Sequence, residues 1–204
     1  MQAQFEVNMR IITGIAKGVK LKVPKGLDVR PTADRVKESM FNILTTMPLT
    51  ITKVAVVGAK VLDLFAGTGN LGLEALSRGA EHALFIDHSS ASLAAIRDNI
   101  CTTKLSELAE VQRGDSVKML AKLSQLGRTF TLVFVDPPYN QGLVNEVLLK
   151  LDTINLLEDG GIIVVEHSKH EVINIEWNYL KLIRTEHYGE TYVTFLLREC
   201  ACTI

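Results

Sequence analysis

Short apolar runs alternate with segments of helical spacing from Lys60 onward. Short runs rich in Val, Ile, Leu and Phe favour β-strands, and their alternation with helices is typical of a parallel α/β sheet. Two of the runs, LVFV and IIVV, are apolar throughout, as expected for strands that are covered on both faces. The pattern predicts five such strands, over residues 61–65, 83–87, 109–113, 132–136 and 161–166.

Helices are expected between these strands. One covers residues 70–78 and ends before Gly79, at the position after a helix C-terminus where glycine is common. Ser89 or Ser90 can cap another helix that runs through residues 96–100. Such strand–helix repeats predict a doubly wound sheet.

The C-terminal part has a different pattern. After residue 166 the helical spacing fades, and residues 179–187 and 192–197 are predicted to form two strands around Gly189. The fold class is therefore α/β, with a mostly parallel sheet that ends in an antiparallel pair of strands.

The segment before Lys60 predicts a separate small unit. The stretch RIITGIAKGVKLKVP is typical of a hairpin that turns between Gly14 and Gly18. A helix that Thr32 can cap should follow. Its apolar face has helical spacing and comprises Val36, Met40, Ile43 and Leu44. We divide the chain into an N-terminal hairpin and helix extension, residues 1–50, and an α/β domain, residues 51–204.

Composition is that of a protein with a substantial core. The chain has 204 residues, of which 47% are hydrophobic, so it can bury a core without disulfides. No apolar run approaches the roughly 20 residues that cross a bilayer, and the start MQAQFEVNMR lacks the basic-then-apolar order of a signal peptide. We expect a soluble, cytoplasmic monomer without a membrane partner.

Metal binding is not expected. The cysteines Cys101, Cys200 and Cys202 lack the CxxC spacing of a zinc site. His167 and His170 follow the fifth predicted strand without a third ligand, so we interpret them as loop histidines rather than metal ligands.

Charge is unevenly distributed. The net charge is −1, yet residues 1–40 carry +4 and the remainder −5. The positive side chains of this segment are Arg10, Lys17, Lys20, Lys22, Lys25, Arg30, Arg35 and Lys37. A basic arm on an acidic body suits a polyanionic substrate such as RNA, although solvated surface lysines give the same pattern.

A glycine-rich loop follows the first predicted strand. The stretch DLFAGTGNLG contains Gly67, Gly69 and Gly72 in GxGxxG spacing between a strand and a helix. Asp87 ends the next strand, where a carboxylate can accept both hydroxyls of a ribose. These features fit NAD as well as S-adenosylmethionine, and glycines chosen only for packing remain an alternative.

Two further carboxylates favour S-adenosylmethionine. Asp63 precedes the loop, where it can hold the ammonium group of an amino acid, which a dinucleotide lacks. Asp115 follows the third predicted strand, at the sheet edge where an adenine amino group can donate to it. An N-cap for a helix over residues 116–126 is an equally good role for Asp115, and the two roles are compatible.

The motif VFVDPPYN indicates the chemistry. Pro137 and Pro138 stiffen the loop at the end of a buried strand. A base amine attacks poorly because its lone pair is delocalised, and it improves when acceptors hold its hydrogens. Asp136 and the Pro137 carbonyl can be these acceptors, and Tyr139 can stack on the base. The alternative is a plain polar turn with Tyr139 half buried.

DLFAGTG together with DPPY resembles the amino-methyltransferase branch of the Rossmann-like class I methyltransferases. The opening MRIITGIAKGVKLKVPKGLDVRPTADRVKESMFNIL resembles the RsmD-type ribosomal RNA guanine-N2 methyltransferases, and the similarity runs from Met9 to the YGET segment. The resemblance implies a seven-stranded sheet, S-adenosylmethionine as cofactor, a catalytic loop from Asp136 to Tyr139, an RPTADR segment that covers the cofactor, and a hairpin that meets RNA.

The expected residue sets follow from these arguments together. The cofactor residues are Asp63, Phe65, Ala66, Gly67, Thr68, Gly69, Asp87, His88, Asp115, Ser116 and Thr32. The catalytic residues are Asp136, Pro137, Pro138 and Tyr139. The RNA-contacting residues are Arg10, Lys17, Lys20, Lys22, Arg30 and Arg35.

The first hypothesis for function is methylation of guanine N2 in 16S ribosomal RNA, free or in an assembling small subunit. A second hypothesis moves the methyl group to adenine N6 in DNA or to a protein glutamine amide. An NAD-dependent oxidoreductase and a non-catalytic RNA-binding module are alternatives from other classes. A last expectation is that removal of residues 1–30 weakens RNA binding and spares much of the cofactor affinity.

Overall fold

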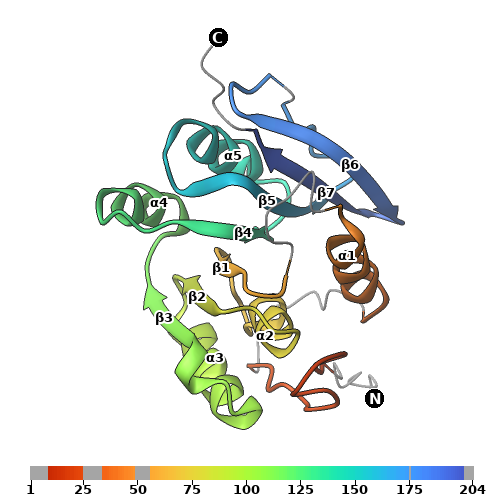
Figure 1. Ribbon diagram of the computed structural model, residues 1–204, viewed down its shortest axis with the longest axis vertical. Helices are drawn as coiled ribbons and strands as arrows, with labels where there is room; N and C mark the ends of the chain where they lie inside the picture. Colours follow the sequence, from red (N-terminus) through yellow and green to blue (C-terminus); the bar gives the residue numbers. More distant parts are fainter. Residues whose placement is uncertain (1–8, 25–33, 49–55, 175, 200–204) are drawn as a thin grey trace, which may run out of the picture.

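A seven-stranded sheet in the order β3-β2-β1-β4-β5-β7-β6 forms the centre of the protein (Figure 1). The computed structural model describes residues 9–24, 34–48, 56–174 and 176–199. The strands are β1 (Lys60–Asp63), β2 (His82–Asp87), β3 (Ala109–Arg113), β4 (Phe130–Val135), β5 (Leu157–Ser168), β6 (Leu180–Tyr188) and β7 (Thr191–Arg198). The helices are α1 (Asp34–Thr46), α2 (Asn70–Ser77), α3 (Ser90–Thr103), α4 (Ser116–Gln125) and α5 (Leu143–Thr153), and a short 3-10 helix, η1, spans Ser106–Leu108.

The strand directions confirm the predicted combination of parallel strands and an antiparallel C-terminal pair. The strands β1 to β5 pair in parallel, and β7 is antiparallel to both β5 and β6. The strand order changes direction between β1 and β4, so the carboxyl ends of these two strands flank the crevice in which open α/β sheets bind ligands. The predicted seven-stranded, mostly parallel sheet with an antiparallel C-terminal pair is confirmed.

Two hydrophobic layers cover the sheet. In β1, Val61 belongs to the layer that contains α1, α2 and α3, whereas Leu62 belongs to the layer that contains α4 and α5 (Figure 1). Adjacent strand residues point to opposite faces, and the apolar residues of β4 are completely buried. This double coverage explains why the strand runs are continuous in hydrophobicity rather than alternating.

The predicted N-terminal hairpin is present in reduced form. It consists of one antiparallel bridge, between Arg10 and Lys20, and a turn in which Gly14 and Gly18 have φ angles of 88° and 84°. A Cβ atom on Gly14 would lie 1.7 Å from the carbonyl oxygen of Ser77 in α2, so only glycine fits there. The hairpin therefore packs directly on the α/β body.

Helix α1 also packs on the body. Its residues Val36, Met40 and Leu44 are buried as the helical spacing predicts, and Ile43 packs against them. Because the described part of α1 begins at Asp34, the predicted cap Thr32 lies outside the described residues. No helix in the described ranges is long and apolar enough to cross a membrane.

Candidate active site

The glycine loop leaves the carboxyl end of β1 and enters α2 at Asn70. Gly67 and Gly69 have φ angles of 56° and 79°, a region that side chains other than glycine rarely adopt. Gly72 has a different role, since a Cβ atom there would lie 2.3 Å from the ring of Phe85. A Cβ on Gly67, in contrast, would meet a single atom of the described residues within 4 Å, the Phe65 carbonyl oxygen at 4.0 Å. The loop is tightly packed at Gly72, and the described residues leave space beside Gly67, which fits a bound ligand.

Asp63 lies at the start of this loop and is buried. Its Oδ2 accepts a hydrogen bond of 2.9 Å from the backbone N–H of Gly72. Burial, with a smaller contribution from nearby Asp87, raises the pKa of Asp63 to about 7. A carboxylate that is disfavoured in this way gains stability when a cation binds beside it.

Asp87 ends β2, as predicted, and its carboxylate holds the backbone on both sides. Its Oδ2 accepts from Gly67 N–H at 2.9 Å and its Oδ1 from Ser89 N–H at 2.8 Å. Each carboxylate oxygen has a further acceptor position, so ribose hydroxyls can still donate to it. The neighbouring His88 is exposed, with Nδ1 3.7 Å from Asp87 Oδ1.

The third strand contributes a helix cap. Asp115 accepts from the backbone N–H of Lys118 at 2.9 Å, so the N-cap role is present, and its exposed side chain keeps acceptor positions for a ligand. Ser116 is buried and donates to the Leu64 carbonyl at 2.5 Å. This bond ties the start of α4 to the segment between β1 and the glycine loop, and thereby places Asp115 beside it.

The Asp136–Tyr139 segment follows β4 directly. Because Asp63 in β1 is in register with Phe134 in β4, Asp136 lies beyond the same edge of the sheet as the glycine loop. Burial is the main cause of a strongly raised pKa of Asp136, and the charges of Glu166 and Asp63 add to it. The structure thus brings the predicted catalytic carboxylate close to the predicted ammonium-binding one.

Tyr139 is anchored by residues that the sequence did not indicate. Its hydroxyl lies 2.9 Å from Oε1 of Glu166, to which it donates, and 3.2 Å from Oγ1 of Thr191. Glu166 is buried in β5, and Thr191 begins β7. Burial and the Glu166 charge raise the pKa of Tyr139, which therefore remains a neutral donor. Residues from two sequence-distant strands fix the ring, and no local motif could have revealed them.

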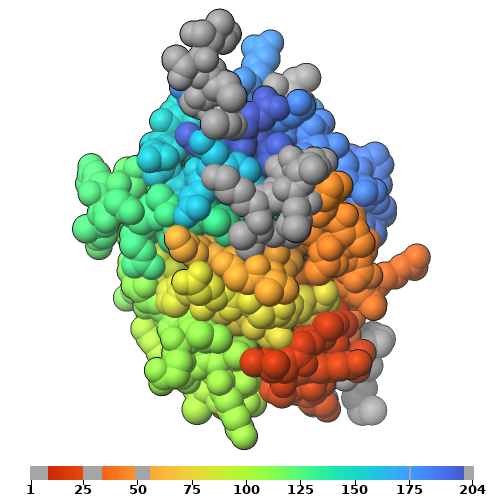
Figure 2. All heavy atoms as spheres, viewed as in Figure 1, coloured from red at the N-terminus to blue at the C-terminus, as the bar shows by residue number. Residues whose placement is uncertain are grey.

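The predicted RNA-contacting residues lie mainly on the surface. Lys17, Lys20 and Arg35 are exposed, whereas Arg10 pairs with Asp34 and Lys22 with Asp98 at 3.0 and 2.9 Å. Arg30 lies outside the described residues. Figure 2 shows the hairpin, in red, on the surface beside the α2 and α3 region. Such exposed cations are available to a polyanion.

The prediction for His167 was wrong. His167 is not in a loop but in β5, where it is buried and its Nε2 lies 2.9 Å from Oγ1 of Thr194. The predicted strand ended at residue 166 because the apolar run ends there, although β5 continues to Ser168 alongside β7. Within the described ranges, no three His, Cys, Asp or Glu side chains are grouped to hold a metal ion.

Comparison with known proteins places the chain in a family. The family model described as "Conserved hypothetical protein 95" matches residues 9–197. The chain belongs to this family. A relative named "Putative rRNA methyltransferase YlbH", from Bacillus subtilis, is 37% identical over 185 residues, which cover 91% of this chain and 96% of the relative. "Ribosomal RNA small subunit methyltransferase D" from Escherichia coli is 42% identical over 153 residues, which cover 75% of this chain and 68% of the relative.

A solved structure agrees with this assignment. "Putative methyltransferase yhhF" from Escherichia coli has a TM-score of 0.80 and 36% identity, and the match covers 94% of this chain and 98% of that one. The family resemblance expected from DLFAGTG, DPPY and the N-terminal segment is confirmed, and the family is one of methyltransferases.

Proposed function

We propose that this protein transfers a methyl group from S-adenosylmethionine to the exocyclic N2 amine of a guanine in 16S ribosomal RNA of the small subunit. The protein is a methyltransferase of the S-adenosylmethionine-dependent class I fold. The observation that carries the proposal is the position of Asp136 and Tyr139 beside the glycine loop, at the end of the neighbouring strand. Relatives named for ribosomal RNA of the small subunit support this acceptor.

The residues around the glycine loop fit the cofactor. Asp63 would hold its ammonium group, Asp87 its ribose hydroxyls and Asp115 its adenine amine. The open side of Gly67 leaves room for backbone approach, and the sulfonium group supplies an activated methyl. No strong base is required before transfer, so positioning of the acceptor carries much of the rate.

The loop after β4 fits a planar amine. The carboxylate of Asp136 and the carbonyl of Pro137 can accept the two amine hydrogens, which favours a pyramidal nitrogen with an available lone pair. Methylation leaves a positive nitrogen that must lose a proton. Because its pKa is raised, ionised Asp136 is a stronger base than an ordinary aspartate and can take this proton. Tyr139, held through its hydroxyl, can stack on the base at a fixed angle.

The exposed basic side chains would bind the RNA backbone. Lys17 and Lys20 lie on the hairpin and Arg35 on α1, and all three are exposed. Phosphate contacts give affinity without reading sequence. The target guanine must be unpaired or flipped to reach Asp136, as RNA readers require.

A direct assay tests the acceptor. The purified protein and labelled S-adenosylmethionine are incubated with one acceptor in each reaction. The acceptors are undermodified small ribosomal subunits, naked 16S RNA, DNA and total protein. We expect label in RNA as N2-methylguanosine. Asp136→Ala should abolish turnover while RNA affinity stays nearly unchanged. Label in DNA as N6-methyladenine, or in protein glutamine, would replace the guanine proposal by the second hypothesis.

A further inference from the structure

The N-terminal arm, defined here as residues 9–24, is linked to the glycine loop through a buried side chain of α3. Asn99, in α3, is completely buried and forms three hydrogen bonds. Its Oδ1 accepts from Lys22 N–H at 2.7 Å, and its Nδ2 donates to the Lys22 carbonyl at 3.0 Å. The same Nδ2 donates to the Thr68 carbonyl in the loop, at 2.9 Å. One carboxamide therefore joins the arm backbone to the loop backbone.

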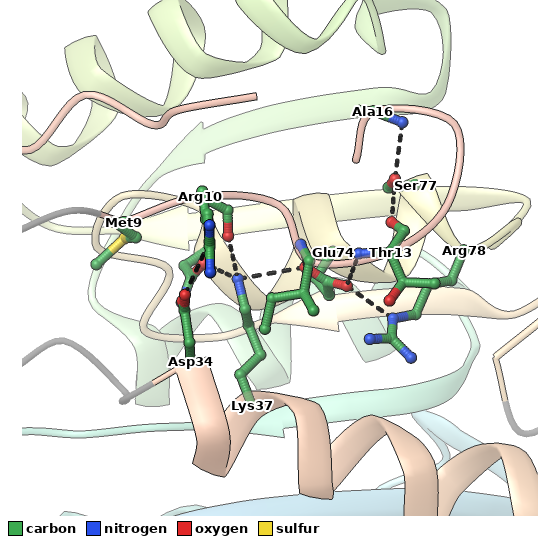
Figure 3. Close-up of polar contacts among 12 residues, drawn as sticks. Met9, Arg10, Thr13, Ala16, Asp34, Lys37, Glu74, Ser77 and Arg78 are labelled. Carbon is green, nitrogen blue, oxygen red and sulfur yellow. Dashed lines mark hydrogen bonds and ion pairs between the residues drawn. The ribbon is translucent and has the colours of Figure 1, made fainter. Parts of the chain in front are cut away.

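A second buried side chain makes the same connection on the other side of Gly69. The ammonium of Lys37 donates to the Arg10 carbonyl and to Asn70 Oδ1, both at 2.6 Å (Figure 3). It also pairs with Glu74 at 3.2 Å. Asn70 is the first residue of α2 and directly follows Gly69. Arm, helix α1 and the start of α2 thus share one cation.

Thr68 has a further contact with the arm. Its hydroxyl lies 3.0 Å from the sulfur of Met9, and both residues are buried. The described arm therefore touches the loop at Thr68, and Lys37 of α1 links it to Asn70, on the other side of Gly69. Gly69 has a left-handed conformation in which the loop turns into α2. Contacts on both sides of this turn fix its shape, because buried polar groups are costly to leave without partners.

We propose that the arm is a positioning element for the cofactor loop, with Asn99 and Lys37 as its positioning residues. Displacement of the arm would take from the buried Asn99 carboxamide its two bonds to Lys22, and from the Lys37 ammonium its bond to the Arg10 carbonyl, and the loop would relax. The inference rests on the proposed role of the loop in binding S-adenosylmethionine. Since Lys17 and Lys20 are on the same arm, RNA bound there and cofactor bound in the loop stabilise the same conformation, and each tightens the other.

This inference changes the expectation drawn from the sequence. The sequence predicts that removal of residues 1–30 spares much of the cofactor affinity, because the cofactor site lies mainly in the α/β body. The bonds of Met9, Arg10 and Lys22 show that the arm is part of the loop's support. We now expect the truncation to weaken cofactor binding as well.

A pair of variants at one position tests the proposal. Lys22→Pro removes the N–H that Asn99 accepts, together with the lysine charge, while Lys22→Ala removes only the charge and its ion pair with Asp98. S-adenosylhomocysteine is titrated into each full-length protein by calorimetry. We expect Lys22→Pro to bind it about fivefold to tenfold more weakly than Lys22→Ala, as loss of one buried hydrogen bond implies. Equal affinities of the two variants would overturn the proposal.

The same variants distinguish positioning from simple support of the fold. A purely structural role would lower the unfolding midpoint of Lys22→Pro and leave its S-adenosylhomocysteine affinity equal to that of Lys22→Ala. Asn99→Asp is a second variant, which keeps the acceptor for Lys22 N–H but sets a carboxylate against two carbonyl oxygens. We expect Asn99→Asp to lose more affinity for S-adenosylhomocysteine than Lys22→Pro does. The readout needs no RNA, so a failure of ribosomal RNA methylation would leave this test intact.

Discussion

Asp63 has a pKa near neutrality, although an ordinary aspartate titrates near 3.8. If its ionised form binds the cofactor ammonium, affinity for S-adenosylhomocysteine must fall as the pH drops below about 7. At pH values well below the pKa of Asp63, the affinity decreases about tenfold for each pH unit. Calorimetric titrations at steps of about one pH unit between pH 5 and pH 8 measure how the affinity changes with pH.

The stability of the cofactor-free protein should show the opposite pH dependence. A carboxyl group whose folded pKa is raised contributes stability at low pH, and this contribution is lost as pH rises from about 4 to about 7. Asp63→Asn is the matched control for both measurements, because its carboxamide oxygen still accepts from Gly72 N–H but does not titrate. A pH slope as steep in this variant as in the parent would contradict the assignment. Asp136, whose pKa is also raised, contributes to the slope that remains.

Tyr139 is a second residue whose role can be isolated. Tyr139→Phe keeps the ring and removes the hydroxyl that contacts Glu166 and Thr191. We expect turnover to fall about tenfold, as the loss of a hydrogen bond to a charged group implies, with S-adenosylhomocysteine affinity unchanged. Tyr179→Phe, at an exposed tyrosine, is the control for removal of a hydroxyl. Equal turnover of the two variants would mean that the hydroxyl does not orient the ring.

At the scale of elements, the buried pair of Lys37 and Glu74 holds α1 and the hairpin to α2. Glu74 also accepts from the N–H groups of Ile12 and Thr13 and from Arg78, at 2.7 to 3.0 Å (Figure 3). Removal of Lys37 would leave Arg78 as the cation paired with Glu74 and would deprive the Arg10 carbonyl and Asn70 Oδ1 of their donor, and breaking a buried pair is strongly destabilising. The network connects three segments that are far apart in sequence.

Urea unfolding can measure this connection. Lys37→Met should reduce the free energy of unfolding by about 3 to 5 kcal/mol. Lys60→Met is a close control, since Lys60 pairs with Glu158 at the same distance of 3.2 Å but at the surface. Lys60→Met should reduce the free energy of unfolding by less than about 1 kcal/mol. Similar losses in the two variants would contradict the role of burial in the Lys37 network.

The elements themselves were largely readable from the sequence. Apolar runs located the parallel strands, because burial on both faces of the sheet requires continuous hydrophobicity. The glycine loop and the DPPY segment were found because turns and stiff loops need particular residues locally. Asp136 and Asp63 then had to be close, since the ends of adjacent parallel strands lie at one edge.

Residues whose role depends on distant partners were not readable. Lys37 is one of the positive charges of residues 1–40, yet it is buried, because Glu74 and two oxygens from other segments surround it. In the sequence, Asn99 is an ordinary polar residue of a helix, and its role follows only from the contact of α3 with the arm. His167 and Glu166 acquire their surroundings only when β7 pairs with β5. In each case the partner lies on another element, so the local sequence pattern does not reveal it.

For the whole molecule, the division of charge predicts how RNA binds. The double variant Lys17→Ala and Lys20→Ala removes two exposed cations that form no ion pair in the described part of the protein. If both contact phosphates, the slope of log affinity against log salt should decrease by roughly 1.4, with S-adenosylhomocysteine affinity unchanged in the absence of RNA. Fluorescence titrations of an RNA stem–loop at several salt concentrations measure the slope. An unchanged slope would place the RNA on another face.

Nucleoside mass spectrometry tests the central claim most directly. Ribosomal RNA of the small subunit from a strain that lacks this gene is digested before and after incubation with the purified protein and labelled S-adenosylmethionine. The account predicts that an N2-methylguanosine is missing and returns with the label, and that the Asp136→Ala protein does not restore it. If the RNA has no missing N2-methylguanosine and takes up no label, guanine in ribosomal RNA is not the acceptor.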